Sequence, residues 1–207
     1  MKKALILDLD NTIYPVSSIA GLLFKQLFDL LDNSADEIDY TTLEAAKDEM
    51  TRRPYHIVAD EYNFSPELKN KGIELLNNLT YDLPMQPFDG YEHIKSVKLK
   101  KFLVTTGFSK LQRSKIKMLD IESDFDEIHI VDLEVSNRTK RDVFLDIMER
   151  HSYTADDLLV VGDDPESEIK AAMELGIETF LFDPDNNHPY ALVTYKHRHL
   201  VKVLEYI

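Results

Sequence analysis

The feature that most constrains this chain is a short apolar segment near its start that ends in two acids. The segment reads Lys3-Ala-Leu-Ile-Leu-Asp8-Leu-Asp10-Asn-Thr12. Because side chains alternate along a strand, Asp8 and Asp10 are expected on one side, with Leu9 on the other. Two neighbouring carboxylates repel each other and are costly to remove from water. The segment therefore predicts a buried strand that ends where a divalent cation or a phosphorylated ligand binds.

Four further apolar segments have the same character, and helical patterns lie between them. The strand-like segments are residues 101–106, 127–131, 158–162 and 178–182. The helical patterns are residues 109–119, 139–150 and 165–175, the last followed by Gly176. Continuous apolar strands that alternate with helices are typical of a parallel sheet covered on both faces. The sequence thus predicts an α/β fold with a Rossmann-like, doubly wound parallel sheet, which binds ligands at the carboxyl ends of its strands.

The segment between the first and second predicted strands is too long for an ordinary crossover. It carries helical periodicity in two stretches, one over residues 67–79 and one marked by Ile19, Leu22, Leu23, Leu27, Leu30 and Leu31. One interpretation is a helical elaboration that only adds stability. The other, which the place of the segment in the chain favours, is a cap over the strand ends. We therefore expect a core of residues 1–14 and 99–207 and an inserted α-helical cap of residues 15–98.

Composition and charge exclude several classes of function. The 207 residues include no Cys, so disulfides, zinc–thiolate sites and cysteine nucleophiles are excluded. A formal net charge of −14 argues against broad contact with nucleic acid. The first apolar run is interrupted by Asp8, unlike a signal peptide, and no later run approaches membrane-spanning length. We expect a cytoplasmic protein with no nucleic-acid or membrane partner.

Polar side chains follow the predicted strands at the same edge of the sheet. They are Asp8 and Asp10, Thr105 and Thr106, Arg138, Lys140 and Arg141, and Asp163 and Asp164. Phosphoryl transfer to a carboxylate needs such a set. One acid attacks phosphorus, and oxygen ligands hold a Mg²⁺ ion that screens the repulsion between the two anions. A lysine and a hydroxyl group stabilise charge on the phosphoryl oxygens.

These residues resemble the motifs of the haloacid dehalogenase superfamily, a large group of aspartate-nucleophile phosphatases. Residues 8–12 resemble its first motif, residues 104–107 its second and residues 161–169 its fourth. Gln112 and Lys115, downstream of the second motif, also fit the family pattern. The opening at residues 10–14 looks closest to the pyrimidine 5′-nucleotidase-like branch. The resemblance covers nearly all of the chain outside the predicted cap, with the motifs in the family's order.

That resemblance implies a role for each site residue. Asp8 would be the nucleophile, and Asp10 would protonate the leaving alcohol and then act as the base on the hydrolytic water. Mg²⁺ would be held by Asp8, by the main-chain carbonyl of Asp10 and by Asp163. The side chains implied to bind the phosphate are those of Thr105, Thr106 and Lys140.

The chain departs from the family pattern in three places. Thr106 stands where the second motif usually has Asn. The Lys-Pro pair of the third motif is missing, so Lys140 is the favoured cation and Arg138 stays open as the alternative. Glu168 replaces a more usual Asp, so its contact with the metal is either direct or through water. Asp164 is expected close by, without direct contact.

The resemblance favours a Mg²⁺-dependent phosphatase acting on a small phosphorylated metabolite, with a nucleoside monophosphate as one candidate. A carbon–halogen hydrolase would have no evident use for Asp10 as an acid. A sugar-phosphate mutase uses both acids and a similar cap, so it remains an alternative. A phospho-accepting switch or a phospho-binding module is the alternative outside enzymes.

Three smaller features allow more than one interpretation. Tyr14 fits either the mouth of the site or the packing of the cap hinge. Three residues of the predicted cap fit either contact with an anionic substrate or exposed helix-end charge, namely Arg52, Arg53 and His56. Three histidines near the C-terminus suggest a metal site, but their segment also fits a solvated or partly packed helix, which we favour: His188, His197 and His199.

Overall fold

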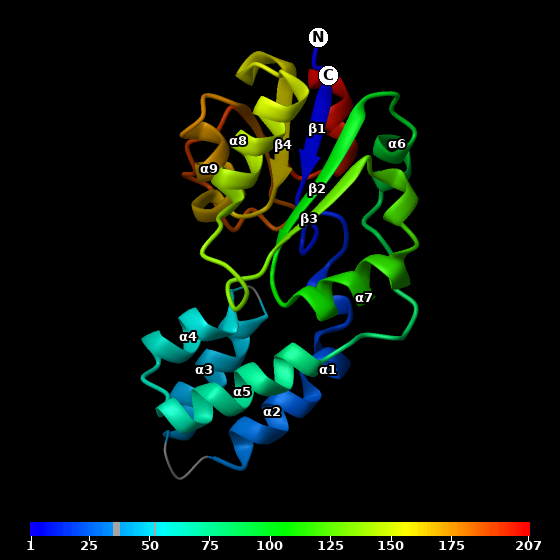
Figure 1. Cartoon of the computed structure of the whole chain (residues 1–207). Coiled ribbons are helices and arrows are strands. Elements are labelled where there is room, and N and C mark those ends of the chain that lie inside the picture. The colour runs from blue at the N-terminus through cyan, green and yellow to red at the C-terminus, as the bar shows by residue number, and fades with distance from the viewer. Residues whose placement is uncertain (35–37, 52) are drawn as a thin grey trace.

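A six-stranded, fully parallel sheet forms the centre of the computed structural model, which describes residues 1–34, 38–51 and 53–207 (Figure 1). The strands are β1 (Ala4–Leu7), β2 (Lys100–Thr106), β3 (Glu127–Val131), β4 (Leu158–Gly162), β5 (Glu178–Phe182) and β6 (Tyr195–His197). Their order is β3-β2-β1-β4-β5-β6, with the first strand inside the sheet. The chain therefore winds outwards from β1 in both directions, and the predicted doubly wound α/β fold is confirmed.

Helices cover both faces of the sheet, as the continuous apolar strands predict. One face packs against α8 (Lys140–His151) and α9 (Lys170–Met173) through an apolar cluster that includes Ile6, Phe102, Val104, Phe144 and Ile147. The other face packs against α6 (Tyr91–Lys95), α7 (Ser109–Leu119) and the 3-10 helix η5 (Leu200–Tyr206). Burial on both faces explains why β1 and β4 have no exposed residue.

The helix predicted over residues 165–175 is not continuous. Its first turn, η4 (Pro165–Ile169), contains Ser167 with non-helical angles of φ −107° and ψ −106°, and regular helix begins only at α9. The Asp164 carboxylate accepts the Glu166 N–H at 2.8 Å and fixes the start of this turn. The helix ends at Met173, two residues earlier than predicted. Gly176 follows its last turn with φ +73°, a left-handed conformation that suits glycine, as expected of a residue that ends a helix.

The prediction of a helix around the C-terminal histidines is wrong for residues 195–197, which form the edge strand β6. This strand pairs with β5, whose outer N–H and C=O groups need partners. The ring of His197 stacks on Phe180 at 5.5 Å, and its Nε2 lies 2.7 Å from the Tyr206 hydroxyl. Within the described part of the chain, no histidine belongs to a group of three or more histidine and acidic side chains close enough to share a metal ion.

Five of the described helices between β1 and β2 form a layer beyond the carboxyl ends of the strands (Figure 1). They are α1 (Ala20–Leu23), α2 (Lys25–Asp32), α3 (Tyr40–Met50), α4 (Tyr55–Glu61) and α5 (Pro66–Asn78). The next helix, α6, lies instead beside η5 and the sheet. The division into a core of residues 1–14 and 99–207 and a cap of residues 15–98 stays a prediction. None of the described helices is long and apolar enough to cross a membrane.

Candidate active site

A cavity of about 470 Å³ lies between the strand ends and the layer of inserted helices. Residues from the first, second and fourth strand ends and from the start of α8 line its floor: Asp8, Asp10, Thr105, Thr106, Lys140 and Asp163. Side chains of the inserted helices line the opposite wall, among them Phe24, Leu27, Met50, Tyr55, His56 and Leu76. The structure therefore brings all the predicted site residues to one cavity, as expected where parallel strands end at one edge.

Lys140 links two buried carboxylates at the floor of the cavity. Its Nζ lies 2.7 Å from Asp8 Oδ1 and 2.7 Å from Glu168 Oε2. Lys140 is the first residue of α8, and reciprocal hydrogen bonds between Thr139 and Asp142 fix where that helix begins. Burial alone would lower the pKa of the Lys140 ammonium, but the two carboxylates outweigh it and raise the pKa above its ordinary value. Lys140 therefore stays charged.

Asp8, Asp163 and Glu168 form an acidic cluster in which one oxygen of each lies within 4.8 Å of the others. Burial raises the pKa of Asp8 to about 7 against the opposing effect of Lys140, and burial with the Glu168 charge raises that of Asp163 well above its usual range. Lys140 contacts two of the three carboxylates, those of Asp8 and Glu168. With all three ionised, the cluster and Lys140 together carry two negative charges, and the raised pKa values show the cost of keeping them ionised without a further cation. One divalent cation with a preference for oxygen ligands fits both this charge and this donor set.

Asp10 lies beside this cluster and has a lysine of its own. Lys115 Nζ donates to Asp10 Oδ1 at 2.8 Å, Gln112 Nε2 donates to Oδ2 at 2.7 Å, and the Tyr14 hydroxyl donates to Oδ1. Burial raises the pKa of Asp10, but these donors outweigh it and hold the pKa below its ordinary value. The cation that meets Asp10 is thus Lys115 of the chain itself, where the sequence led us to expect a divalent cation or a phosphorylated ligand.

The Thr105 hydroxyl is oriented by the same glutamine. Gln112 Nε2 donates to Thr105 Oγ1 at 2.7 Å and to the main-chain oxygen of Thr106 at 3.3 Å. Because Oγ1 accepts this hydrogen bond, the hydroxyl proton of Thr105 is left to be donated to another group. Gly107 follows with φ +149°, and a Cβ there would lie 3.1 Å from Gln112 Cδ, so a glycine is needed for this close approach.

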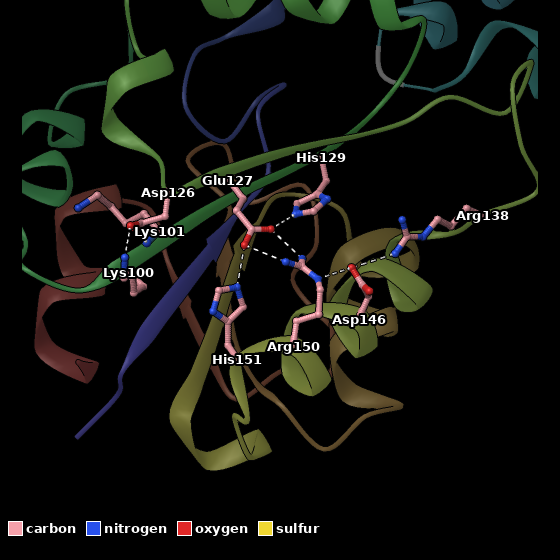
Figure 2. A network of polar contacts seen from close by, with 9 residues as sticks. All are labelled: Lys100, Lys101, Asp126, Glu127, His129, Arg138, Asp146, Arg150 and His151. Carbon is pink, nitrogen blue, oxygen red and sulfur yellow. Dashed lines mark hydrogen bonds and ion pairs between the residues drawn. The ribbon is translucent and has the colours of Figure 1, made fainter.

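Arg138, the alternative third-motif cation, lies away from the cavity. Its Nη2 is 3.2 Å from Asp146 Oδ2, and Asp146 also binds Arg150. Figure 2 shows these residues in a polar network beside β3, with the Glu127 carboxylate between Arg150 and two histidines. The structure thus places Lys140, and not Arg138, against Asp8.

The other open alternatives have different outcomes. Tyr14 is fully buried and bonded to Asp10, so it contacts a residue of the site but does not lie at the mouth of the cavity. Arg53 borders the cavity, but its guanidinium is bound by Glu49 and, in two contacts of 2.7 Å, by Glu61. His56 also borders the cavity and is half-buried. Arg52 lies outside the described residues.

Sequence reasoning missed the contacts of Gln112 and Lys115 with Asp10. Both residues are on α7, three positions apart, and both are buried together with Leu111, Ile116 and Leu119. A glutamine and a lysine on the apolar face of an amphipathic helix are costly to bury unless they have a partner. That pattern was visible in the sequence, although it does not identify Asp10 as the partner.

Comparisons with known proteins agree with this fold. The family model described as haloacid dehalogenase-like hydrolase matches residues 5–182. The glyceraldehyde 3-phosphate phosphatase of Pyrococcus furiosus is 21% identical over 192 residues, which cover 87% of this chain and 80% of that protein. The magnesium-bound HAD-hydrolase YfnB of Bacillus subtilis superposes with a TM-score of 0.66 at 20% identity. The match covers 99% of this chain and 97% of the YfnB chain. The HAD phosphatase of Thermococcus onnurineus superposes with a TM-score of 0.65 at 20% identity, and the match covers 99% of this chain and 97% of that protein.

Proposed function

The chain belongs to the haloacid dehalogenase-like hydrolase family, and from this premise we propose that it is a Mg²⁺-dependent phosphatase of a small phosphomonoester. The observation that carries the proposal is the pair Asp8 and Asp10, which line one cavity and are each bonded to a different lysine. The cluster of Asp8, Asp163 and Glu168 would, in addition to Lys140, need two positive charges to become neutral when its carboxylates are ionised. The magnesium in YfnB and the phosphomonoester in the name of the Pyrococcus relative support it.

In the proposed first step, Asp8 attacks the phosphorus of the substrate. Lys140 occupies Asp8 Oδ1, so we assign the attack to Oδ2. A bond forms between this oxygen and phosphorus, and the ester bond from phosphorus to the alcohol oxygen breaks. Lys140 and the proton of Thr105 stabilise negative charge on the phosphoryl oxygens, where preorganised donors contribute most to the rate.

Asp10 handles the protons in both steps of the proposed reaction. It donates one to the departing alcohol, and it then takes one from the water that attacks the aspartyl phosphate and releases inorganic phosphate. The Lys115 contact favours the ionised form of Asp10, which suits the second step. An arriving phosphate dianion adds negative charge beside Asp10 and so favours the protonated form that the first step needs.

The acidic cluster fits Mg²⁺, with Asp8, Asp163 and the main-chain carbonyl of Asp10 as its ligands. When bound, the ion supplies positive charge that holds Asp8 ionised and screens its repulsion from the phosphate. Glu168 binds Lys140 directly and accepts the Asp164 N–H at 2.8 Å, so it also holds the loop that carries Asp163.

The substrate class rests on two sources. The Pyrococcus relative is named for a phosphorylated aldehyde, and residues 10–14 resemble the pyrimidine 5′-nucleotidase-like branch, which suggests a nucleoside monophosphate. Both are small phosphomonoesters. A sugar-phosphate mutase would use the same acid pair, and it differs in yielding an isomeric sugar phosphate without net release of inorganic phosphate.

A phosphate-release assay tests the proposal. The purified chain is incubated with Mg²⁺ and a panel of sugar phosphates, triose phosphates, nucleoside monophosphates and p-nitrophenyl phosphate, with and without EDTA. We expect EDTA-sensitive release that Asp8→Asn abolishes while circular dichroism shows an unchanged fold. Release that survives in Asp8→Asn, or no release from any compound, would overturn it. An isomeric product without phosphate would identify the mutase.

A further inference from the structure

Three side chains that make no bond to phosphorus in the proposed reaction hold the Asp10 carboxylate. We propose that Gln112, Lys115 and Tyr14 are positioning residues that fix Asp10 toward the leaving oxygen, so that the enzyme depends on them most for esters with poor leaving groups. The inference rests on the proposed function and extends it to residues outside the family motifs that contain Asp8, Thr105 and Asp163.

The Asp10 carboxylate has one hydrogen-bonding position left for a substrate. A carboxylate offers about four acceptor positions on its two oxygens. Lys115 and Tyr14 fill two positions on Oδ1, and Gln112 fills one on Oδ2. The side chain keeps 25% of its surface exposed and borders the cavity. The remaining acceptor position is therefore the one that a ligand in the cavity reaches.

The three donors have little freedom to move. The side chain of Lys115 is 6% exposed, and Gln112 and Tyr14 are buried. Lys115 Nζ also lies 5.9 Å from the centre of the Tyr14 ring, within the range of a cation–π contact. Burying an ammonium group and an amide on the core face of α7 is costly, whereas apolar side chains there would pack without that cost. A role in the reaction accounts for their presence.

Gln112 also ties the acid to the phosphate-binding hydroxyl. The same Nε2 atom donates to Asp10 Oδ2 and to Thr105 Oγ1, each at 2.7 Å. The proton donor for the leaving oxygen and the donor for a phosphoryl oxygen are thereby held at a fixed spacing. Such fixed placement is what makes proton transfer effective, because small displacements of a catalytic group lower the rate steeply.

Tyr14 connects this arrangement to the inserted helices. It is the last residue of the predicted core before the chain enters the insertion, and the residue before it, Ile13, accepts the Phe88 N–H at 2.7 Å. The outgoing and returning connections of the insertion thus meet beside Tyr14. The orientation of Asp10 is consequently coupled to the inserted helices, whose side chains line the wall of the cavity opposite the strand ends.

The test compares one substrate with a good leaving group and one with a poor one. General acid assistance matters little for p-nitrophenolate and greatly for an alkoxide. The readout is kcat/KM, which covers only the steps up to the loss of the alcohol and so leaves out the later hydrolysis of the aspartyl phosphate, which both substrates share. For Lys115→Met we expect kcat/KM to fall about 10²-fold with the best alkyl phosphate of the wild type and under about fivefold with p-nitrophenyl phosphate. Tyr14→Phe, which keeps the ring and removes only the hydroxyl, should show the same selectivity at about tenfold.

The matched control is Lys110→Met, the same substitution on the exposed face of α7. It should leave kcat/KM unchanged for both substrates. Equal losses of kcat/KM on the two substrates, or no loss, would overturn the inference. If Lys115→Met does not fold, Tyr14→Phe decides it by the same criterion. Failure of the proposed function shows separately, because the wild type would then release no phosphate or Asp8→Asn would still do so.

Discussion

The Glu168 carboxylate occupies the space in which any side chain of Gly162 would begin. A Cβ built on Gly162 would lie 2.1 Å from Glu168 Oε1, far inside van der Waals contact. Glu168 is 2% exposed, and its two oxygens bind the Lys140 ammonium and the Asp164 N–H. The last residue of β4 is thus a glycine because the group that holds Lys140 lies directly against it.

Gly162→Ala should therefore disturb both stability and catalysis. The new methyl group forces Glu168 away from Lys140, and overpacking of this kind costs about 1–3 kcal/mol of the free energy of unfolding. Urea denaturation measures the first effect and the kcat for phosphate release measures the second. Gly21→Ala is the control, because a Cβ there meets nothing within 4 Å and Gly21 lies in a helix. It should leave stability unchanged or raise it by up to about 1 kcal/mol. Equal behaviour of the two variants would contradict this explanation of Gly162.

Glu168→Gln should weaken magnesium binding without removing the cavity. The change deletes one of three charges in the cluster and weakens the hold on Lys140, and losses of this type cost about 10–100-fold in metal affinity. Calorimetric titration with Mg²⁺ measures the affinity directly. Glu166→Gln, two residues earlier with a side chain that is 83% exposed, is the control and should bind Mg²⁺ as the wild type does. An unchanged affinity in Glu168→Gln would exclude this carboxylate from the metal site.

Comparing Lys140→Met with Arg138→Met tests which of the two cations binds the phosphate of the substrate. Removing Lys140 leaves the Asp8 and Glu168 carboxylates without their shared ammonium, and kcat should fall by about 10²–10³-fold. Arg138 pairs with Asp146 on the surface, so its loss should change kcat by less than about threefold. Circular dichroism checks that both variants fold. A larger loss of activity from Arg138→Met would reverse the assignment.

The sheet and the place of the site were predictable because both follow from local patterns. Strands covered on both faces, such as β1 and β4, must be apolar at successive positions, and parallel strands end at the same edge. The choice between Lys140 and Arg138 was also within reach. The reciprocal hydrogen bonds of Thr139 and Asp142 fix the first turn of α8 and turn Lys140 inward.

The remainder depends on contacts between distant parts of the chain. Residues 195–197 are half-buried and carry no apolar run, so only the free edge of β5 makes them a strand. The partner of Lys115 is 105 residues away in the sequence, at Asp10. The interruption of the helix at Ser167 arises where Glu168 turns toward Lys140, a contact that helical periodicity does not encode.

Stability should depend on pH through Glu127, which lies in the polar network of Figure 2. Hydrogen bonds from Arg150, with smaller contributions from His151 and His129, lower the pKa of Glu127 from 4.5 to about 2. The folded state therefore binds this proton less readily than the unfolded state. The ionised Glu127 therefore stabilises the folded state fully above the unfolded-state pKa of 4.5, and this contribution to the free energy of unfolding is lost as the pH falls through about 2. Because Arg150 and the histidines are partly exposed, solvent screening limits this stabilisation to about 1 kcal/mol.

Glu127→Gln should consequently unfold more easily than the wild type at pH 7 and nearly as the wild type does at the lowest pH at which both fold. Urea denaturation at a series of pH values between 7 and 3 measures the difference in the free energy of unfolding, which should narrow below about pH 4.5. Glu122→Gln, an exposed residue before β3, serves as the control and should show no difference at any pH. If the deficit of Glu127→Gln stayed constant over this range, its cause would be lost packing, because lost charge would make the deficit shrink as Glu127 becomes protonated.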